Sequence, residues 1–180
     1  MTSDFGPRTT TNNHELRTQN YEPRTKNTNM PKLQYAIGVD LGATTVKTGL
    51  VTSAGKIIMQ TKLPTLGEQG PKAVIRQMKK SIEEVMIHAK GKTLRGIGIG
   101  SPGIVDEKGG IVKDPPNISG WHHVALGEKI QKSFKLRVAV ENDANVAAIA
   151  EAKFGAGKRY PSFLFVIWGT GVGGGIILDG

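Results

Sequence analysis

Apolar residues concentrate in three short stretches, residues 35–40, 46–52 and 56–62, each of them rich in Val, Ile and Leu. Stretches of this length and composition are typical of β-strands. The loops between them, residues 41–45 and 53–55, contain glycine and are short enough to join antiparallel neighbours. These residues therefore predict a three-stranded antiparallel meander.

Beyond residue 70 the pattern becomes that of a helix followed by a strand. A stripe of apolar residues begins just after Gly70-Pro71 and lies opposite a charged face that we expect to meet water. Residues 94–100 are a continuous run of apolar residues and glycine, which predicts a strand buried on both faces between helices. The stripe comprises Val74, Ile75, Met78, Ile82, Val85 and Met86, and the charged face comprises Lys72, Arg76, Lys79, Lys80 and Glu83.

The rest of the chain continues the alternation of strands and helices. This order predicts an α/β fold with a mixed five-stranded sheet flanked by helices, and a second unit that begins at residue 163. The expected elements are a small hairpin at 104–105 and 111–112, a helix at 126–134, a strand at 137–141, a helix at 144–154 capped by Gly155, and a hairpin at 163–168 and 175–178.

Residues 1–34 differ in composition from the rest. Thr and Asn account for 12 of these 34 residues, and the apolar residues are scattered without the period of a strand or a helix. Such a segment cannot bury enough apolar surface to fold, so we expect a disordered arm. Three parts are therefore expected: the arm at 1–34, a lobe at 35–162, and the start of a second lobe at 163–180.

Composition narrows the class of protein. The chain holds 24 Lys and Arg against 15 Asp and Glu, a net charge of +9, but the basic residues are spread over predicted helices and turns, so we expect no nucleic-acid partner. No apolar stretch approaches the roughly 20 residues that a bilayer span requires, so we expect no membrane association. The lack of cysteine excludes disulfides and thiolate ligands, gives zinc no support, and fits a cytoplasmic location.

Two glycine-threonine loops and an acidic segment between them indicate phosphoryl transfer. The loops, residues 40–45 and 169–175, each join two apolar strands, so their free backbone N–H groups can face phosphate oxygens. The segment 141–145 supplies carboxylates. Phosphoryl transfer asks a protein mainly to align the acceptor with the phosphate and to neutralise charge, which needs N–H-rich loops, a metal and one carboxylate.

Other interpretations of the glycine motifs compete with this one. Residues 98–103 match GxGxxG, but a predicted hairpin follows instead of the helix that a dinucleotide site requires, so the match is spurious. The sequence contains no GxxxxGK followed by Ser or Thr, which excludes a P-loop. The loop at 40–45 by itself would most often be a plain hairpin turn, whereas two paired loops favour a phosphate site.

A series of motifs along residues 35–180 resembles known families. Residues 39–45 and 168–177 resemble the two phosphate loops of the sugar kinase, actin and heat-shock ATPase superfamily. Together with the other motifs they are similar to the ROK (repressor, open reading frame, kinase) family, in particular its bacterial glucokinases. The resemblance implies a ribonuclease H-like lobe, ATP and Mg²⁺ as cofactors, a hexose acceptor with glucose as the leading candidate, and a role in glycolysis. The other motifs are residues 101–103, 117–121, 141–145 and 154–157.

The resemblance implies roles for individual residues. Asp143 matches the family's catalytic aspartate, the general base for the primary hydroxyl of the sugar, and Asn142 matches a residue that holds a neighbouring hydroxyl. Asn117 and the Gly103 backbone match sugar contacts. Asp40 corresponds to the acidic residue near Mg²⁺, which it would hold through water. The phosphate-cradling positions are Gly42, Thr44, Thr45, Gly169, Thr170 and Gly171, although many relatives carry Lys or Asn in place of Thr45.

Simpler roles compete at several of these positions. Either Asn142 or Asp143 can cap the helix that follows, which leaves the other free. Asn117 follows two prolines, so a role in the turn is about as well supported as a ligand role. Residues 121–123, Trp-His-His, can line the sugar site or only cover its loop.

The resemblance also implies parts that these 180 residues do not hold. The chain stops at Gly180, after the first hairpin of the expected second lobe, so we expect a kinase truncated after its first lobe, with little or no turnover on its own. A homodimer is one possible state of the full-length form. The alternatives are a non-catalytic sugar-sensing ROK regulator and an interaction module built on the same core. Mannose, allose and N-acetylmannosamine are alternative acceptors, and polyphosphate is an alternative donor.

Overall fold

The structure, a computed structural model, describes residues 33–106, 110–168 and 171–180, so the predicted arm at 1–34 lies almost wholly outside the described residues. Within them no helix is long and apolar enough to span a bilayer. In chain order the elements are β1 (Gln34–Leu41), β2 (Thr45–Thr52), β3 (Ile57–Pro64), the 3-10 turn η1 (Gly67–Gln69), α1 (Pro71–Ile87), β4 (Thr93–Ser101), β5 (Ile104–Asp106), β6 (Ile111–Lys113), β7 (His123–Ala125), α2 (Leu126–Phe134), β8 (Val138–Asn142), α3 (Asp143–Phe154), the 3-10 turn η2 (Ala156–Arg159), β9 (Phe163–Trp168) and β10 (Val172–Ile177).

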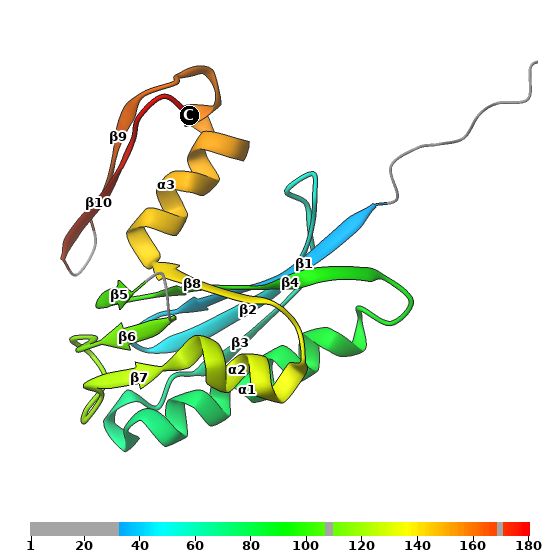
Figure 1. Cartoon of the computed structure of the whole chain (residues 1–180), viewed down its shortest axis with the longest axis vertical. Helices are drawn as coiled ribbons and strands as arrows, with labels where there is room; N and C mark the ends of the chain where they lie inside the picture. The colour runs from blue at the N-terminus through cyan, green and yellow to red at the C-terminus, as the bar shows by residue number, and fades with distance from the viewer. Residues whose placement is uncertain (1–32, 107–109, 169–170) are drawn as a thin grey trace, which may run out of the picture. The chain divides into compact units, whose positions relative to one another are not determined.

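Five strands form one mixed sheet, in the order β3-β2-β1-β4-β8 (Figure 1). Strands β1, β2 and β3 pair antiparallel, which confirms the predicted meander. Strand β4 pairs parallel with β1 and with β8, so the three run in the same direction. Their carboxyl ends, at Leu41, Ser101 and Asn142, therefore meet at one edge of the sheet, which is where ligands bind in open α/β folds.

The hydrophobic core lies between one face of this sheet and helices α1 and α2 (Figure 1). Alternate residues of the strands, such as Ile37 and Leu41 in β1 and Leu50 in β2, are fully buried there. The predicted stripe of α1 is confirmed, because Val74 and Met78 have no exposed surface. Full burial of one side chain of this size stabilises the fold by roughly 1.5–3 kcal/mol. These contacts fix the edge of the sheet that carries the strand ends.

The opposite face of the sheet is poor in side chains. Gly38, Gly49 and Gly98 lie along a shallow pocket on it, and Gly98 is exposed. The prediction that residues 94–100 are buried on both faces is therefore wrong. Glycine at alternate positions made the stretch look uniformly apolar, but glycine contributes no side chain that a second layer could bury.

Helix α3 and the β9–β10 hairpin pack against each other. A Cβ at Gly175 would lie 2.6 Å from the Cβ of Ala148, so glycine at this position lets β10 lie directly on α3. The predicted hairpin is confirmed, but β10 begins at Val172 instead of residue 175. Because glycine has low strand propensity, the sequence did not predict the first half of this strand. The lobe boundary at residue 163 stays a prediction.

Strands β5, β6 and β7 form a small antiparallel sheet beside the main one. The hairpin of β5 and β6 was predicted, whereas β7 was not. At three residues β7 is too short to leave an apolar pattern, and its pairing with β6 depends on the loop that brings it back. This small sheet positions the loop that contains Asn117.

Candidate active site

A cleft of about 920 Å³ lies at the carboxyl ends of β1, β4 and β8 and extends to α3 and the β9–β10 hairpin. Side chains and backbone from widely separated parts of the chain line it. Six residues that the sequence indicated as functional are among them: Asp40, Gly103, Asn117, Asn142, Asp143 and Gly171.

Asn142 ends β8 and caps helix α3. Its Oδ1 accepts hydrogen bonds from the N–H groups of Ala144, at 3.0 Å, and Asn145, at 3.3 Å. Its Nδ2 donates to the carbonyl oxygen of Gly103 at 3.2 Å. These bonds decide between the two capping candidates, because Asn142 satisfies the helix end.

Asp143 is the first residue of α3, and its side chain is exposed and lines the cleft. Its Oδ1 accepts a hydrogen bond of 2.9 Å from the N–H of Ala144. No hydrogen bond reaches its Oδ2 from any residue that the structure describes. One carboxylate oxygen is therefore available to a ligand in the cleft, and backbone geometry restrains the other.

Gly103 forms the turn that follows β4. Its φ of +89° is in the region that favours glycine. A Cβ at this position would lie 2.6 Å from the carbonyl oxygen of Lys113, so a side chain does not fit. Glycine thus allows the chain to turn tightly and presents the carbonyl group that binds Asn142.

Asn117 lies on an exposed loop whose backbone is held by the segment around Gly67. A Cβ at Gly67 would lie 2.4 Å from the carbonyl oxygen of Asn117, and the N–H of Ser119 donates to the Gly67 carbonyl at 3.1 Å. The N–H of Ile118 donates to the carbonyl of Pro115 at 3.3 Å, which closes the turn. Asn117 therefore belongs to a turn and also lines the cleft, so the two alternatives coexist.

The first glycine-threonine loop is a tight turn between β1 and β2. The N–H of Gly42 donates to the carbonyl of Thr45 at 3.1 Å, so it is not free. Thr65 supports the loop, because its Oγ1 donates to the Gly42 carbonyl at 2.7 Å and its N–H donates to the Thr44 carbonyl at 2.9 Å. The N–H groups of Ala43 and Thr44 have no acceptor among the described residues. These two groups are the ones available to an anion.

The cleft reaches only part of the predicted phosphate loops. Gly42, Thr44 and Thr45 are not among the residues that line it. In the second loop Gly171 and the start of β10 line the cleft, whereas Gly169 and Thr170 lie outside the described residues.

Asp40 forms an ion pair with Lys47 across the β1–β2 hairpin, with 3.2 Å between Oδ2 and Nζ. The two residues lie directly opposite each other in the register of the strands, and both side chains are about half exposed. Lys47 belongs to none of the sequence motifs, although its place opposite an acidic residue in a predicted hairpin indicates such a pair.

The donor groups in the cleft fit Mg²⁺ better than a metal that needs a protein cage. Among the described residues no three His, Cys, Asp or Glu side chains come together. Magnesium is typically held by one or two carboxylates together with water and substrate phosphates. Asp40 is an exposed carboxylate that lines the cleft, so it is a group of the required kind.

Trp121 and the histidines after it support the loop and do not line the cleft. Trp121 is 2% exposed, and its Nε1–H donates to the carbonyl of Val112 at 3.0 Å. His122 is exposed and lies 3.2 Å from Asp114, between Nδ1 and Oδ1. Of the two alternatives for residues 121–123, covering the loop is the one that fits these positions.

The model of the ROK family matches residues 36–180. The chain belongs to the ROK family. This membership confirms the family that the phosphate loops and the segment 141–145 indicated, and the α/β fold class expected from it agrees with the ROK structures that the chain resembles.

Members of the ROK family with different functions resemble this chain. Glucokinase of Thermotoga maritima is 42% identical over 151 residues, which are 84% of this chain and 46% of the relative. The xylose repressor of Caldicellulosiruptor bescii is 32% identical over 147 residues, 79% of this chain and 36% of the repressor. The chain spans about half the length of the curated glucokinases it matches.

Solved structures of the family show the same fold. A ROK family glucokinase from Streptomyces griseus, in complex with glucose and AMPPNP, superposes with a TM-score of 0.73 at 35% identity, covering 81% of this chain and 45% of that one. The ROK hexokinase from Thermus thermophilus gives a TM-score of 0.71 at 31% identity, covering 81% of this chain and 47% of that one.

Proposed function

We propose that this chain carries the acceptor side and part of the donor side of an ATP- and Mg²⁺-dependent hexose kinase that works in the cytoplasm, with glucose as the leading acceptor. The observation that carries the proposal is the position of Asp143. Its carboxylate is exposed in a cleft that Asn117, Asn142 and Gly171 also line. The Thermotoga maritima glucokinase and the Streptomyces griseus structure with glucose and AMPPNP support the same class of reaction.

The sugar would bind against the β8–α3 junction. Asn117 offers an exposed amide, and the carbonyl of Gly103 lies beside the amide of Asn142. Because the helix cap and the bond to Gly103 hold Asn142, it can orient a hydroxyl without moving. Positioning of this kind is a large part of what an enzyme contributes to phosphoryl transfer.

Asp143 would act as the general base. Its Oδ2 accepts the proton of the primary hydroxyl, while Oδ1 stays bonded to the N–H of Ala144. The hydroxyl oxygen then forms a bond to the γ-phosphorus, the bond from that phosphorus to the bridging oxygen breaks, and ADP leaves with the electron pair. Mg²⁺, when bound, neutralises charge on the phosphate oxygens.

The phosphate donor would be held by groups at the carboxyl end of β1 and at the start of β10. Asp40 would hold Mg²⁺ through water, and Lys47, its ion-pair partner, would gain a second anion to interact with. The free N–H groups of Ala43 and Thr44 would face phosphate oxygens, as backbone N–H groups do in anion-binding loops. The roles of Gly42, Thr45, Gly169, Thr170 and Gly171 stay part of this proposal.

A non-catalytic sugar-sensing regulator is the second candidate, and the xylose repressor relative favours it. A regulator needs the sugar contacts at Asn117 and Asn142 but gains nothing from a bound Mg·ATP. The two candidates therefore differ in nucleotide binding.

Calorimetry on the 180-residue chain tests the proposal. A kinase binds glucose and Mg·ATP, a sensor binds sugar only, and a chain that binds neither contradicts both candidates. We expect Asp143→Ala to weaken glucose binding about 10- to 100-fold, because a hydrogen bond to a charged group is lost. Glu83→Ala is the matched control, since Glu83 is an exposed carboxylate of helix α1 that does not line the cleft. Equal effects of the two substitutions would refute the role of Asp143.

A further inference from the structure

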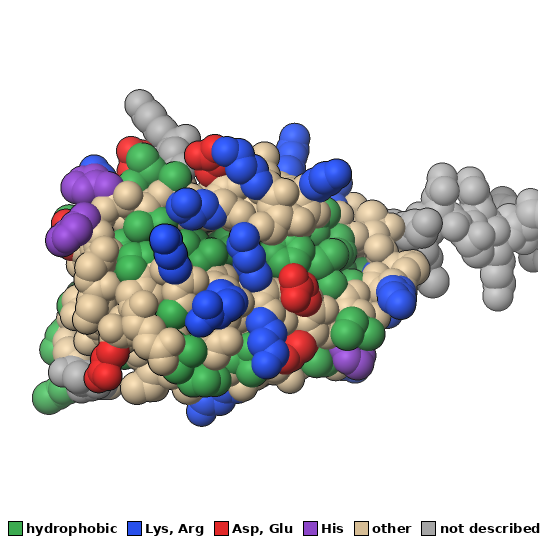
Figure 2. Space-filling view, turned by 90° about the horizontal axis from the view of Figure 1, so that it is seen from below, with side chains coloured by type: hydrophobic (Ala, Val, Ile, Leu, Met, Phe, Trp, Pro, Cys, Tyr) green, Lys and Arg blue, Asp and Glu red, His purple; other side chains and the backbone are tan. Residues whose placement is uncertain are grey.

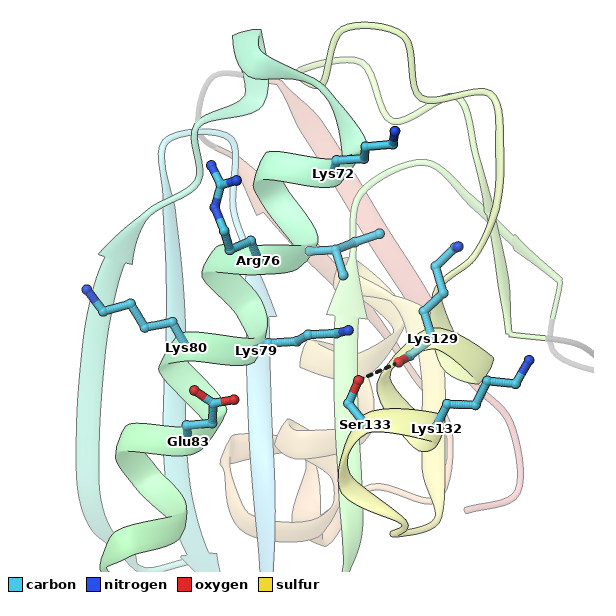
Figure 3. Close-up of a pocket in the computed structure, with 9 residues that line it drawn as sticks. Lys72, Arg76, Lys79, Lys80, Glu83, Lys129, Lys132 and Ser133 are labelled. Atoms are coloured by element: carbon cyan, nitrogen blue, oxygen red, sulfur yellow. Dashed lines mark hydrogen bonds between the residues drawn. The ribbon is translucent and has the colours of Figure 1, made fainter.

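A second concave surface, distinct from the cleft, lies between helices α1 and α2. This basic groove has a volume of about 680 Å³, and Figure 2 shows the lysine and arginine side chains gathered on this face of the molecule. Figure 3 shows Lys79 pointing from α1 toward α2, and Lys129 and Lys132 projecting from α2. The groove shares no residue with the cleft. It is lined by Lys72, Ile75, Arg76, Lys79, Lys80, Glu83, Lys129, Lys132 and Ser133.

The sequence did not reveal this concentration of charge. The expectation that the basic residues are spread over helices and turns is wrong for these six, because the fold brings the charged face of α1 against the polar face of α2. Neither helix alone carries a basic groove. The charged face of α1 is largely exposed to water, as expected, and it also forms one side of this groove.

Most of these cations have no acidic partner. Within the described residues, ion pairs involve only one of the six, Lys132, which pairs with Glu128 one turn earlier in α2. Glu83 lines the groove but makes no ion pair with its basic neighbours. The groove therefore keeps a net positive charge that nothing in the described chain neutralises.

The arrangement of these cations is unfavourable for helix α1 itself. Lys72, Arg76 and Lys80 follow one another at four-residue spacing, where like charges repel along one helix face. Lys72 also lies in the first turn, where the helix dipole disfavours a positive charge, and that turn holds no acidic residue. A bound anion would reduce this repulsion in the first turns of α1.

The composition of the groove indicates phosphate as the anion. Five of the six cations are lysine, which binds phosphate as a point charge. The lining contains no aromatic side chain on which a base could stack, which disfavours nucleic acid. It also lacks the large exposed apolar residues of a membrane-surface helix, since Ile75 is the one apolar residue of the lining and is only partly exposed.

The shape of the groove indicates a linear chain. The basic residues of α1 form one row from Lys72 to Lys80, and two further lysines lie on α2. Figure 3 shows Lys79 pointing toward α2, whereas Arg76 and Lys80 point to the other side of α1. At 1.5 Å per residue, the α1 row is about 12 Å long. A single phosphate would contact only part of this row, whereas a chain of phosphates would follow it along its length.

We propose that the groove between α1 and α2 binds linear inorganic polyphosphate. The site is a binding surface and takes no part in the transfer reaction, because no residue of it lines the cleft. Binding releases the counterions of the phosphate chain, so affinity falls steeply with salt.

The test measures the binding of a short polyphosphate of defined length to the 180-residue chain over a range of salt concentrations. The variant Lys79→Ala with Lys129→Ala removes one cation from each helix. We expect about tenfold weaker binding and a salt slope reduced by about 2, because two phosphate contacts are lost. The control, Lys56→Ala with Lys90→Ala, removes two exposed lysines outside the groove and leaves affinity and slope unchanged.

Three results would overturn the proposal. The first is an equal loss of binding in the groove variant and the control variant. The second is poly-glutamate or single-stranded DNA binding as tightly as polyphosphate, since either would show that the anion is not a phosphate chain. The third is an unchanged salt slope in the groove variant. Circular dichroism of both variants, compared with the parent chain, shows whether folding is retained, and charge reversal at Lys72 alone provides a second variant if it is not.

Discussion

The Nδ2 atom of Asn142 donates a hydrogen bond of 3.2 Å to the carbonyl oxygen of Gly103, and this bond joins the start of helix α3 to the turn that follows β4. The Oδ1 atom of the same side chain caps the helix. One residue thus fixes two walls of the cleft relative to each other. Because Asn142 performs this structural task, its neighbour Asp143 keeps one carboxylate oxygen free.

We expect Asn142→Ala to lower the free energy of unfolding by about 1–3 kcal/mol. The substitution removes the helix cap, which is worth about 0.5–2 kcal/mol, together with the bond to Gly103. Glucose binding should weaken as well, because the turn at Gly103 loses its partner. Urea unfolding followed by circular dichroism measures the first effect, and calorimetry measures the second.

Asp143→Ala serves as the comparison for the cap. Its side chain is exposed and accepts one bond from the adjacent residue, so the free energy of unfolding should change by no more than about 0.5 kcal/mol. A larger loss of stability at position 143 than at position 142 would contradict the assignment of Asn142 as the cap.

Thr65 joins the loop at residues 42–45 to the segment that holds the Asn117 loop. It is fully buried, its Oγ1 bonds the carbonyl of Gly42 at 2.7 Å, and it lies two residues before the Gly67 that contacts Asn117. We expect Thr65→Val to lower the free energy of unfolding by about 1–2 kcal/mol, because the partly buried carbonyl of Gly42 loses its partner. Binding of Mg·ATP should weaken because the loop is released.

Thr65→Ser separates the hydroxyl from the methyl group. Serine keeps the donor to Gly42, so it should preserve Mg·ATP binding even if the lost methyl lowers stability slightly. If the serine and valine variants lose nucleotide binding equally, Thr65 acts through packing alone and the proposed hydrogen-bond role is wrong. Thermal unfolding and calorimetry of both variants provide the comparison.

Local patterns were enough to predict the elements that depend on neighbouring residues. The meander of β1 to β3 and the apolar stripe of α1 follow from the spacing of apolar residues, which strand and helix geometry dictate directly. Strand β7 and the first half of β10 were missed because their pairing depends on a returning loop and on glycines with low strand propensity.

The sequence likewise predicted only part of the candidate site. The types of residue at Asp40, Asn142 and Asp143 were visible in the sequence, and the fold brings all three to one cleft. Which of Asn142 and Asp143 caps the helix could not be predicted, because both residue types favour that position. Thr65 carried no motif, and its role arises only from bonds to residues more than 20 positions away.

A substitution at Trp121 tests whether the loop that carries Asn117 depends on one buried hydrogen bond. Its Nε1–H donates to the carbonyl of Val112, and Trp121→Phe removes that donor and part of the ring volume. We expect a loss of about 1–3 kcal/mol in the free energy of unfolding. Trp168→Phe is the control: its side chain is 87% exposed, so a change within about 0.5 kcal/mol is expected. Urea unfolding of the two variants measures this difference. Equal losses in the free energy of unfolding would exclude the proposed role of Trp121 in anchoring the loop.

Glu128 offers a gain-of-binding test of the basic groove. The hydrogen bond and the charge of Lys132 lower the pKa of the Glu128 carboxyl from its ordinary value, so the pair persists at neutral pH. Glu128→Gln would remove a negative charge and release Lys132, so we expect polyphosphate to bind about two- to tenfold more tightly at pH 7.

The Glu128–Lys132 pair also predicts the direction in which polyphosphate binding changes with pH. Because the folded pKa of Glu128 is depressed, the contribution of the pair to stability is present above the unfolded pKa and is lost as the pH falls through the folded pKa. Over that window Lys132 loses its partner, so polyphosphate binding to the parent chain should tighten. Glu83, which lines the groove, is present in both the parent and the variant, so the difference between them isolates Glu128. Identical pH profiles for the two proteins would show that Lys132 does not contribute to the groove.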